Sequence, residues 1–175
     1  MRRVLNGDKQ AIDALVRKHY QDIYRYCVRR IGVNDAADLT QEIFLRLTKA
    51  LFQYRFTGKF SNFLFTIAVN ACTDYERRKP RVFVDIEDVQ QADDGLTPFE
   101  AVLLSERAEI VNRRLDALPD IQKDAIILHY YHGFKIQDIA KITGVSLPTA
   151  KSRLKQGMDK LRKTFGEEDY FEESR

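Results

Sequence analysis

Residues 135–155 read KIQDIAKITGVSLPTAKSRLK, and the spacing of this stretch decides the fold of the C-terminal part of the chain. Its first half predicts a short helix with one buried face. The residues of that face are Ile136, Ile139, Ala140 and Thr143. Because the side chain of Ala140 is small, a second helix can pack closely against it. Gly144 then ends the first helix.

The second helix follows directly. Ser146 is a suitable N-cap, and Pro148 is tolerated in the first turn, where backbone N–H groups have no intrahelical partner. The inward residues are Ala150, Leu154 and Met158, and the outward ones are Thr149, Lys151, Ser152, Lys155 and Gln156. Such outward groups suit phosphates and major-groove base edges. The stretch therefore predicts a DNA-binding helix-turn-helix, with a plain helical hairpin bearing a solvated basic face as the alternative.

Charge alternates in blocks along the chain of 175 residues, although the net charge is only +3. The block charges are +7 for residues 1–80, −5 for 81–104, +5 for 105–165 and −4 for 166–175. Two basic blocks separated by an acidic one are typical of two nucleic-acid-binding domains and a linker. A hydrophobic content of 44% excludes wholesale disorder.

The acidic block is also a break in composition. Pro80 and Pro98 bracket it, Gly95 interrupts it, and it has no sustained helical period. We therefore predict an all-α protein with two small helical domains joined by an extended acidic linker. The predicted parts are a domain at 1–80, the linker at 81–104, a domain at 105–165 and a solvated acidic tail at 166–175.

Cysteine content and hydropathy indicate a cytoplasmic protein. Cys27 and Cys72 fall in amphipathic helical patterns, without a CxxC motif or a His at ligand spacing, which favours buried reduced thiols over a disulfide or a zinc site. No stretch approaches the roughly 20 apolar residues of a membrane span, and no signal-peptide core is present. Without a P-loop or GxGxxG motif, we expect no cofactor.

Three apolar stripes predict the core of the first domain. They are Ile12, Leu15, Val16, Tyr20, Ile23, Tyr26 and Cys27; then Ala37, Leu39, Ile43, Leu47, Ala50 and Leu51; then Phe63, Ile67, Ala68, Ala71, Cys72 and Tyr75. Aromatic residues at helical spacing more often pack than recognise ligands.

A polar patch lies at the start of the helix that the second stripe predicts. It consists of Asn34, Asp35, Asp38, Gln41 and Glu42. Acidic groups at a helix start are favoured by the helix dipole, so capping and a solvated face can explain them. A metal site is a weaker alternative, because Asp38 and Glu42 lie one turn apart but no His joins them.

The third stripe has a polar side that packing does not explain. Its residues are Asn62, Thr66, Asn70, Thr73 and Arg77, and a loop with Tyr54, Phe56, Gly58, Lys59 and Phe60 precedes it. Aromatic, amide and cationic side chains together are typical of proteins that hold unstacked bases of single-stranded DNA.

Four segments, in this order, resemble the extracytoplasmic-function (ECF, group IV) sigma factors of bacterial RNA polymerase. They read GDKQAIDALVRKHYQDIYRYCVRR, DAADLTQEIFLRL, FLFTIAVNACTDYERRK and LPDIQKDAIILHYYHGFKIQDIAKITGVSLPTAKSRL. The resemblance implies a promoter-melting region 2 followed by a region 4 with the helix-turn-helix.

The resemblance also implies a role for each polar face. The polymerase-binding residues, which would meet the β′ clamp helices, are Asp35, Asp38, Gln41 and Glu42. Those for the −10 element are Phe56, Lys59, Asn62, Asn70, Thr73 and Arg77. Those for the −35 element are Thr149, Lys151, Ser152, Lys155 and Gln156. Region 4 would in addition contact the β flap.

Three positions depart from the family pattern. Phe63 stands where Trp is usual, and Pro148 replaces a common Gly. Residues 156–158 replace a more basic run, and Gly157 costs about 1 kcal/mol of helix propensity relative to Ala. We therefore expect fewer phosphate contacts at that end of the recognition helix.

We predict a dissociable initiation subunit that binds core RNA polymerase and promoter DNA, without catalytic residues, metal or small-molecule substrate. The resemblance implies a cognate anti-sigma factor, which in this family is often a membrane protein. One alternative is a two-domain helix-turn-helix regulator that acts without serving as a polymerase subunit, which would leave the acidic patch and Asn70 unused. Another is a nuclease using Asp35, Asp38 and Glu42, but these lack a His or Lys partner.

Overall fold

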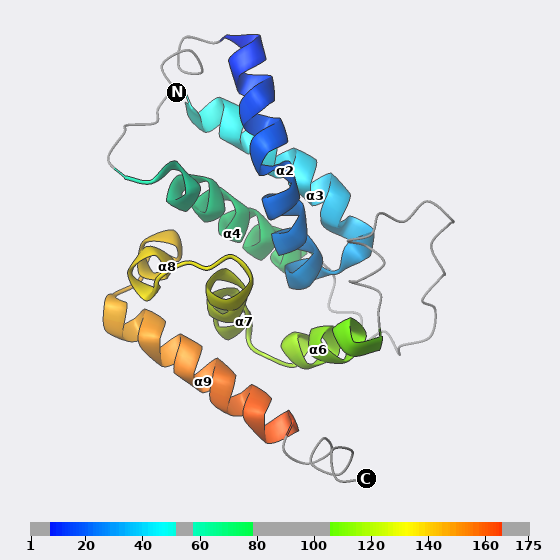
Figure 1. Cartoon of the computed structure of the whole chain (residues 1–175), viewed down its shortest axis with the longest axis vertical. Helices are drawn as coiled ribbons and strands as arrows, with labels where there is room; N and C mark the ends of the chain where they lie inside the picture. Colours follow the sequence, from blue (N-terminus) through cyan, green and yellow to red (C-terminus); the bar gives the residue numbers. More distant parts are fainter. Residues whose placement is uncertain (1–7, 52–57, 79–105, 166–175) are drawn as a thin grey trace.

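The computed structural model describes residues 8–51, 58–78 and 106–165. Within these ranges the chain is helical and contains no strand (Figure 1). The elements are α2 (Lys9–Ile31), α3 (Val33–Leu51), α4 (Phe60–Arg78), α6 (Glu106–Asp116), α7 (Asp120–Ile126), the π-helical turn η1 (Ile127–Tyr131), α8 (Ile136–Ile142) and α9 (Leu147–Phe165). The predicted linker, the predicted tail and Phe56 lie outside the described residues. None of the described helices is long and apolar enough to cross a membrane.

Helices α2, α3 and α4 form the N-terminal domain. Helix α2 starts after Asp8, whose side chain accepts hydrogen bonds from two backbone N–H groups, and it ends at Gly32, whose φ of 92° suits a glycine. It packs against both α3 and α4. The first and third predicted stripes face this core. In the second, Ala37 is exposed and Ala36 is buried instead, because the buried face of α3 runs 36, 39, 40, 43 and 47.

The two cysteines meet inside this domain. Cys27 of α2 and Cys72 of α4 are fully buried and hydrogen-bonded to each other. The hydrogen bond with Cys27 and burial raise the pKa of the Cys72 thiol, so Cys72 stays protonated at neutral pH. The prediction of buried thiols is therefore confirmed.

Helices α6 to α9 form the C-terminal domain, in which α9 packs against α7 and α8. Gly144, with a φ of 66°, makes the turn after α8. The Oγ of Ser146 accepts a hydrogen bond from the N–H of Thr149 at 3.3 Å, so the predicted cap is present. Ala150 and Leu154 are buried, as the helical spacing predicts.

Gly157 has a packing role that its helix propensity does not reveal. It is buried, and a Cβ atom built on it would lie 2.7 Å from Cδ1 of Ile126. Because this position of α9 faces the interior, a basic side chain there would not reach DNA. The propensity cost expected for Gly157 is therefore accompanied by close packing against Ile126, and the expected loss of phosphate contacts over residues 156–158 stays a prediction.

The two domains pack against each other, which the sequence did not predict. Helix α4 contacts α8, and α2 contacts η1 and α6 (Figure 1). At the centre of this interface, the carboxylate of Asp124 accepts hydrogen bonds from Nε of Arg30 at 2.8 Å and from the hydroxyl of Tyr26 at 2.7 Å. All three side chains are buried, so the charges of Arg30 and Asp124 depend on each other for compensation.

Aromatic rings complete the interface. The ring of His132, just after η1, lies 4.8 Å from the ring of Phe65 and 6.0 Å from that of Tyr26, measured between centroids. Phe134 meets Phe65 at 4.8 Å in an edge-to-face arrangement. Burial lowers the pKa of His132 to about 4, so the imidazole is neutral at physiological pH.

Candidate polymerase and nucleic-acid interfaces

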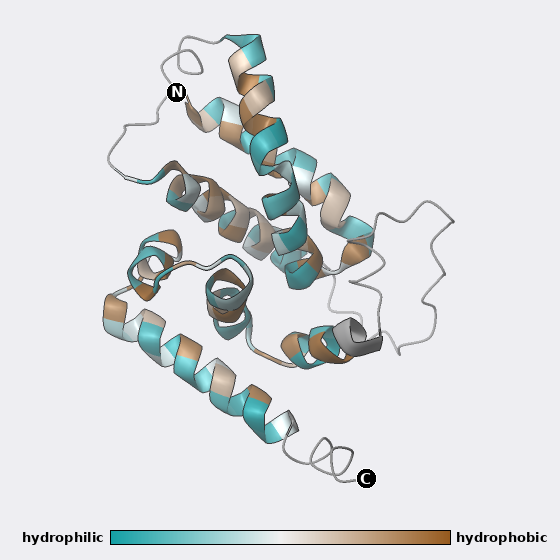
Figure 2. Ribbon diagram, in the orientation of Figure 1, coloured by the Kyte–Doolittle hydropathy of each residue, from teal (hydrophilic) through white to brown (hydrophobic). Residues whose placement is uncertain are grey.

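The outer face of α9 carries all five residues predicted to read duplex DNA. They are Thr149, Lys151, Ser152, Lys155 and Gln156, and each is exposed. Hydrophilic residues alternate with hydrophobic ones along this helix, as expected when only one face is buried (Figure 2). Gln156 is held in place, because its amide donates to Oγ of Ser152 at 3.1 Å and accepts from the amide of Gln122 at 3.1 Å.

The polar face of α3 has a more varied environment. Asp38 and Gln41 are exposed, whereas Asp35 and Glu42 are partly buried. Glu42 accepts a hydrogen bond from Arg46 at 2.6 Å, and Arg46 also donates to Asp74 of α4 at 2.9 Å. The hydrogen bond from Arg46 lowers the pKa of Asp74. Glu42 is thus oriented by an ion network that links α3 to α4.

An exposed apolar residue lies within the same face. Leu45 has 63% of its surface exposed, and it follows Asp38, Gln41 and Glu42 at helical spacing. A large apolar side chain among exposed polar ones is suited to a protein partner. Leu45 was not among the predicted contact residues, although its place in a polar stripe of the sequence was a visible signal.

The far half of α4 presents its polar stripe to solvent. Asn70 and Arg77 are exposed, and Asn70 lies opposite the buried Ala68 and Cys72. The hydroxyl of Thr73 is partly buried and donates to the carbonyl oxygen of Val69 at 2.9 Å. Asn70 and Arg77 are therefore the members of this half that are free to meet a ligand.

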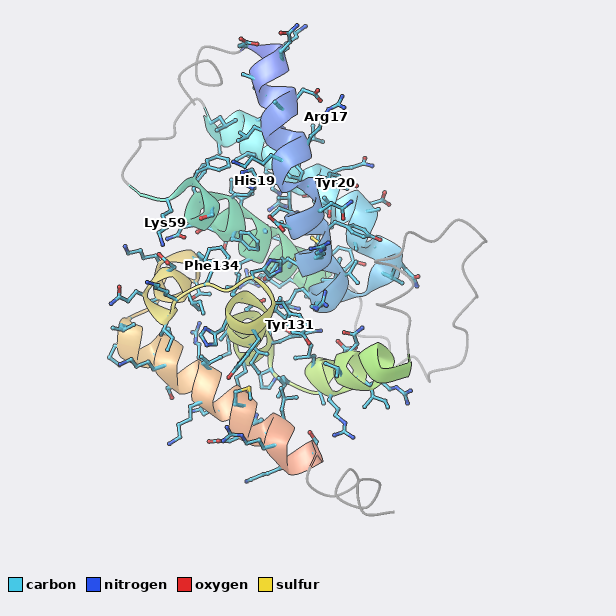
Figure 3. The ribbon with its side chains drawn as sticks, viewed as in Figure 1. Arg17, His19, Tyr20, Lys59, Tyr131 and Phe134 are labelled. Atoms are coloured by element: carbon cyan, nitrogen blue, oxygen red, sulfur yellow. The ribbon has the colours of Figure 1, made fainter. Side chains whose placement is uncertain are left out.

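The start of α4 is engaged by the other domain. Nζ of Lys59 donates to Oδ2 of Asp138 at 2.9 Å, and Nδ2 of Asn62 donates to Oδ1 of the same carboxylate at 2.8 Å. Lys59 lies at this end of α4, next to α8 (Figure 3). The hydrogen bonds from Asn62 and Lys59 hold the pKa of Asp138 below its usual range, so the carboxylate is charged at neutral pH. Asp138 was not among the residues predicted from the sequence to have a role.

Acidic side chains do not gather into a metal centre in the parts of the chain described here. Within residues 8–51, 58–78 and 106–165, no three His, Cys, Asp or Glu side chains lie close enough to hold a metal ion.

Comparison with known proteins identifies the family. The Sigma-70 region 2 family matches residues 15–82, and the Sigma-70 region 4 family matches residues 108–161. An ECF RNA polymerase sigma-E factor of Haemophilus influenzae is 32% identical over 162 residues, which cover 87% of this chain and 86% of that protein. The chain belongs to the ECF sigma factors. The resemblance read from the four sequence segments is confirmed.

Other ECF sigma factors are similar over nearly the whole length. SigW of Bacillus subtilis is 29% identical over 93% of both chains. Among solved structures, CnrH in complex with the cytosolic domain of CnrY matches with a TM-score of 0.72, 20% identity and coverage of 95% of this chain and 94% of that one. The sigma factor RpoE of Bartonella quintana, in complex with the anti-sigma factor NepR, matches with a TM-score of 0.70, 20% identity and coverage of 91% and 99%. At these identities the two structures establish a shared fold.

Proposed function

We propose that this ECF sigma factor binds core RNA polymerase through α3 and directs initiation at promoters contacted by α9 and α4. The observation that carries the proposal is the placement of the predicted contact residues on three separate helices, each with exposed members. The exposed predicted residues are Asp38 and Gln41 on α3 and Asn70 and Arg77 on α4. On α9, all five predicted residues are exposed.

The face of α3 would dock against a basic polymerase surface. Its carboxylates supply charge complementarity, and Arg46 fixes the orientation of Glu42. Leu45 adds an apolar contact at the C-terminal end of the face. Docking would bring α4 and α9 to the promoter together, so that two modest DNA affinities combine through effective concentration.

The DNA contacts would differ in kind. Lys151 and Lys155 of α9 can meet phosphates or guanine edges of the duplex −35 element. Asn70 can hydrogen-bond an unstacked base of the −10 element, which would offset the cost of unpairing, a few kcal/mol per base in flipping systems. The sigma factor would thus act by binding alone.

A cognate anti-sigma factor is part of the proposal. The two solved relatives are complexes of a sigma factor with the cytosolic domain of CnrY and with the anti-sigma factor NepR. We propose a partner of the same kind for this chain, and we place its action in the cytoplasm with core polymerase.

Transcription with purified core polymerase tests the proposal. The wild-type chain should give promoter-specific initiation, whereas Asp38→Arg with Gln41→Arg should lose co-purification with core enzyme, because both side chains are exposed and the added positive charges repel a basic partner without disturbing the fold. Asn70→Ala should keep polymerase binding but reduce open-complex formation about five- to a hundredfold, the range for one base-specific contact. DNA binding without promoter-specific initiation would instead identify a regulator that is no polymerase subunit.

A further inference from the structure

Asp138 is the residue through which α8 holds the start of α4. Each of its two carboxylate oxygens accepts a hydrogen bond from a different donor, one from Lys59 and one from Asn62. The Asp138 side chain is only 11% exposed, whereas that of Lys59 remains 64% exposed. We call the arrangement in which α8 packs on α4 the closed form.

The two donors form an anion-binding arrangement. A backbone phosphate of DNA offers the same features as the Asp138 carboxylate, namely two oxygen acceptors that share one negative charge. Lys59 and Asn62 also lie at the N-terminal end of the 19-residue helix α4, where the helix dipole favours an anion. A carboxylate already bound at the site demonstrates that its donors converge.

We propose that Lys59 and Asn62 bind a backbone phosphate of single-stranded promoter DNA, and that Asp138 occupies this site in the closed form as an internal competitor. The inference rests on the proposed function, because it assigns regulation to the same α4 face. Closure and phosphate binding at this site then exclude each other, since one pair of donors cannot serve both anions.

The competition is confined to one end of one DNA-binding face. Asn70 and Arg77, further along α4, are exposed in the closed form, and so are Lys151 and Lys155 of α9. The closed form therefore leaves the duplex-reading row available and engages Lys59 and Asn62, two of the residues predicted to bind the −10 element. Opening of the domains becomes a separate step that precedes strand capture.

The direct test is the affinity of the full chain for a fluorescent single-stranded oligonucleotide of mixed sequence, since phosphate contacts carry no sequence information. Asp138→Asn should bind about three- to tenfold more tightly, the size of one net hydrogen-bond contribution, because Lys59 is largely exposed and solvent screens its charge. The plot of log affinity against log salt should steepen by about 0.7, the value for one added phosphate contact to a single strand.

Asp13→Asn is the matched control. It removes the same charge from an exposed pair of α2, in which Asp13 accepts a hydrogen bond from Arg17, so it corrects for the general effect of a more positive chain. If Asp138→Asn binds no more tightly than Asp13→Asn, the inference is overturned.

A double-mutant cycle tests whether the two residues compete through the same site. In the wild-type chain, Lys59→Ala removes a DNA contact but also weakens closure, so the two effects partly cancel. In the Asp138→Asn background only the lost contact remains, and Lys59→Ala should reduce affinity by a larger factor. Equal factors in both backgrounds would overturn the inference.

A measurement on the unmodified chain covers the case in which Asp138→Asn does not fold. Saturating single-stranded DNA should release α8 from α4 and speed hydrogen exchange in residues 136–142. Unchanged or slower exchange there would overturn the inference. If exchange is unchanged or slower but the chain still directs promoter-specific initiation, only the inference fails and the proposed function stands. If neither wild type nor Asp138→Asn directs initiation, the proposed function itself is refuted.

Discussion

At the scale of single residues, Gly157 sets how closely α9 approaches Ile126. Alanine at this position gains about 1 kcal/mol of helix propensity but places its Cβ 2.7 Å from Cδ1 of Ile126 and 3.3 Å from Cβ of Gln122. We expect Gly157→Ala to bring no stabilisation, because the contact offsets the gain. In an Ile126→Val background, which lacks the Cδ1 atom, the same change should stabilise by up to about 1 kcal/mol. Urea unfolding of the four chains measures both values, and a gain in the wild-type background would contradict the packing argument.

His132 gives the closed form a dependence on pH. In the unfolded chain His132 takes up a proton near pH 6.5, whereas burial lowers the pKa of His132 in the closed form to about 4. Between these values the unfolded state binds more protons, so the closed form loses stability against unfolding as the pH falls from 6.5 towards 4, by up to about 1.4 kcal/mol per pH unit. Arg25 and Arg29 also lower this pKa, and Asp22 opposes them.

The measurement is the free energy of unfolding between pH 7 and pH 4.5 for wild type and His132→Phe. Phe suits the ring cluster of Tyr26 and Phe65 and cannot titrate. The difference between the two curves isolates the imidazole from the carboxyl groups that titrate in the same range. Parallel curves would show that His132 is not the group responsible.

At the scale of elements, α3 combines a buried apolar face with a face suited to docking. Leu45→Asp should weaken co-purification with core polymerase about tenfold or more, the size of a central apolar contact at an interface, without loss of helix content. Val33→Asp is the control, because Val33 is also exposed on α3 but lies about 120° around the helix from Leu45. Equal effects of the two changes would place the polymerase elsewhere.

How far the sequence predicts an element depends on whether its causes are local. Helix periodicity, the Ser146 cap and the Gly144 turn are set within a few residues, and the three helices of the first domain, the pair α8 and α9 and the outward row of α9 were predicted from them. A shift of one position was enough to misplace Ala37. The role of Gly157 was missed because the neighbour that requires it, Ile126, lies on another helix.

At the scale of the whole molecule, the contact between the domains could not be predicted. Arg30 and Asp124 are separated by 94 positions, and no periodicity relates them. The sequence marks Arg30 only as one of several cations at the end of α2. Lys59 and Asn62 were predicted to bind DNA, but their partner Asp138 lies in the helix-turn-helix, 76 or more positions away along the chain. Nothing in the local sequence pattern distinguishes this carboxylate from an ordinary solvated acidic residue.

Arg30→Ala should separate the domains. Burial already raises the pKa of Asp124, and removal of Arg30 leaves this carboxylate without its cation, a loss of about 3–5 kcal/mol for a buried pair. Separation lets water solvate Asp124, so the radius of gyration from X-ray scattering should increase and urea unfolding should split into two transitions. Arg17→Ala breaks an exposed ion pair, in which the side chains of Arg17 and Asp13 are 79% and 60% exposed. This control should change neither the radius of gyration nor the number of unfolding transitions. An unchanged radius for Arg30→Ala would show that other contacts suffice for closure.

The buried thiols of Cys27 and Cys72 can report on local opening of the N-terminal domain. A small alkylating reagent can reach either sulfur only while α2 and α4 are parted, because both cysteines are fully buried. The rate of alkylation therefore reports how often α2 and α4 separate transiently, and no added label is needed. Followed with and without single-stranded DNA, the same reaction would distinguish a strand that merely undocks the neighbouring domain from one that loosens the three-helix core itself.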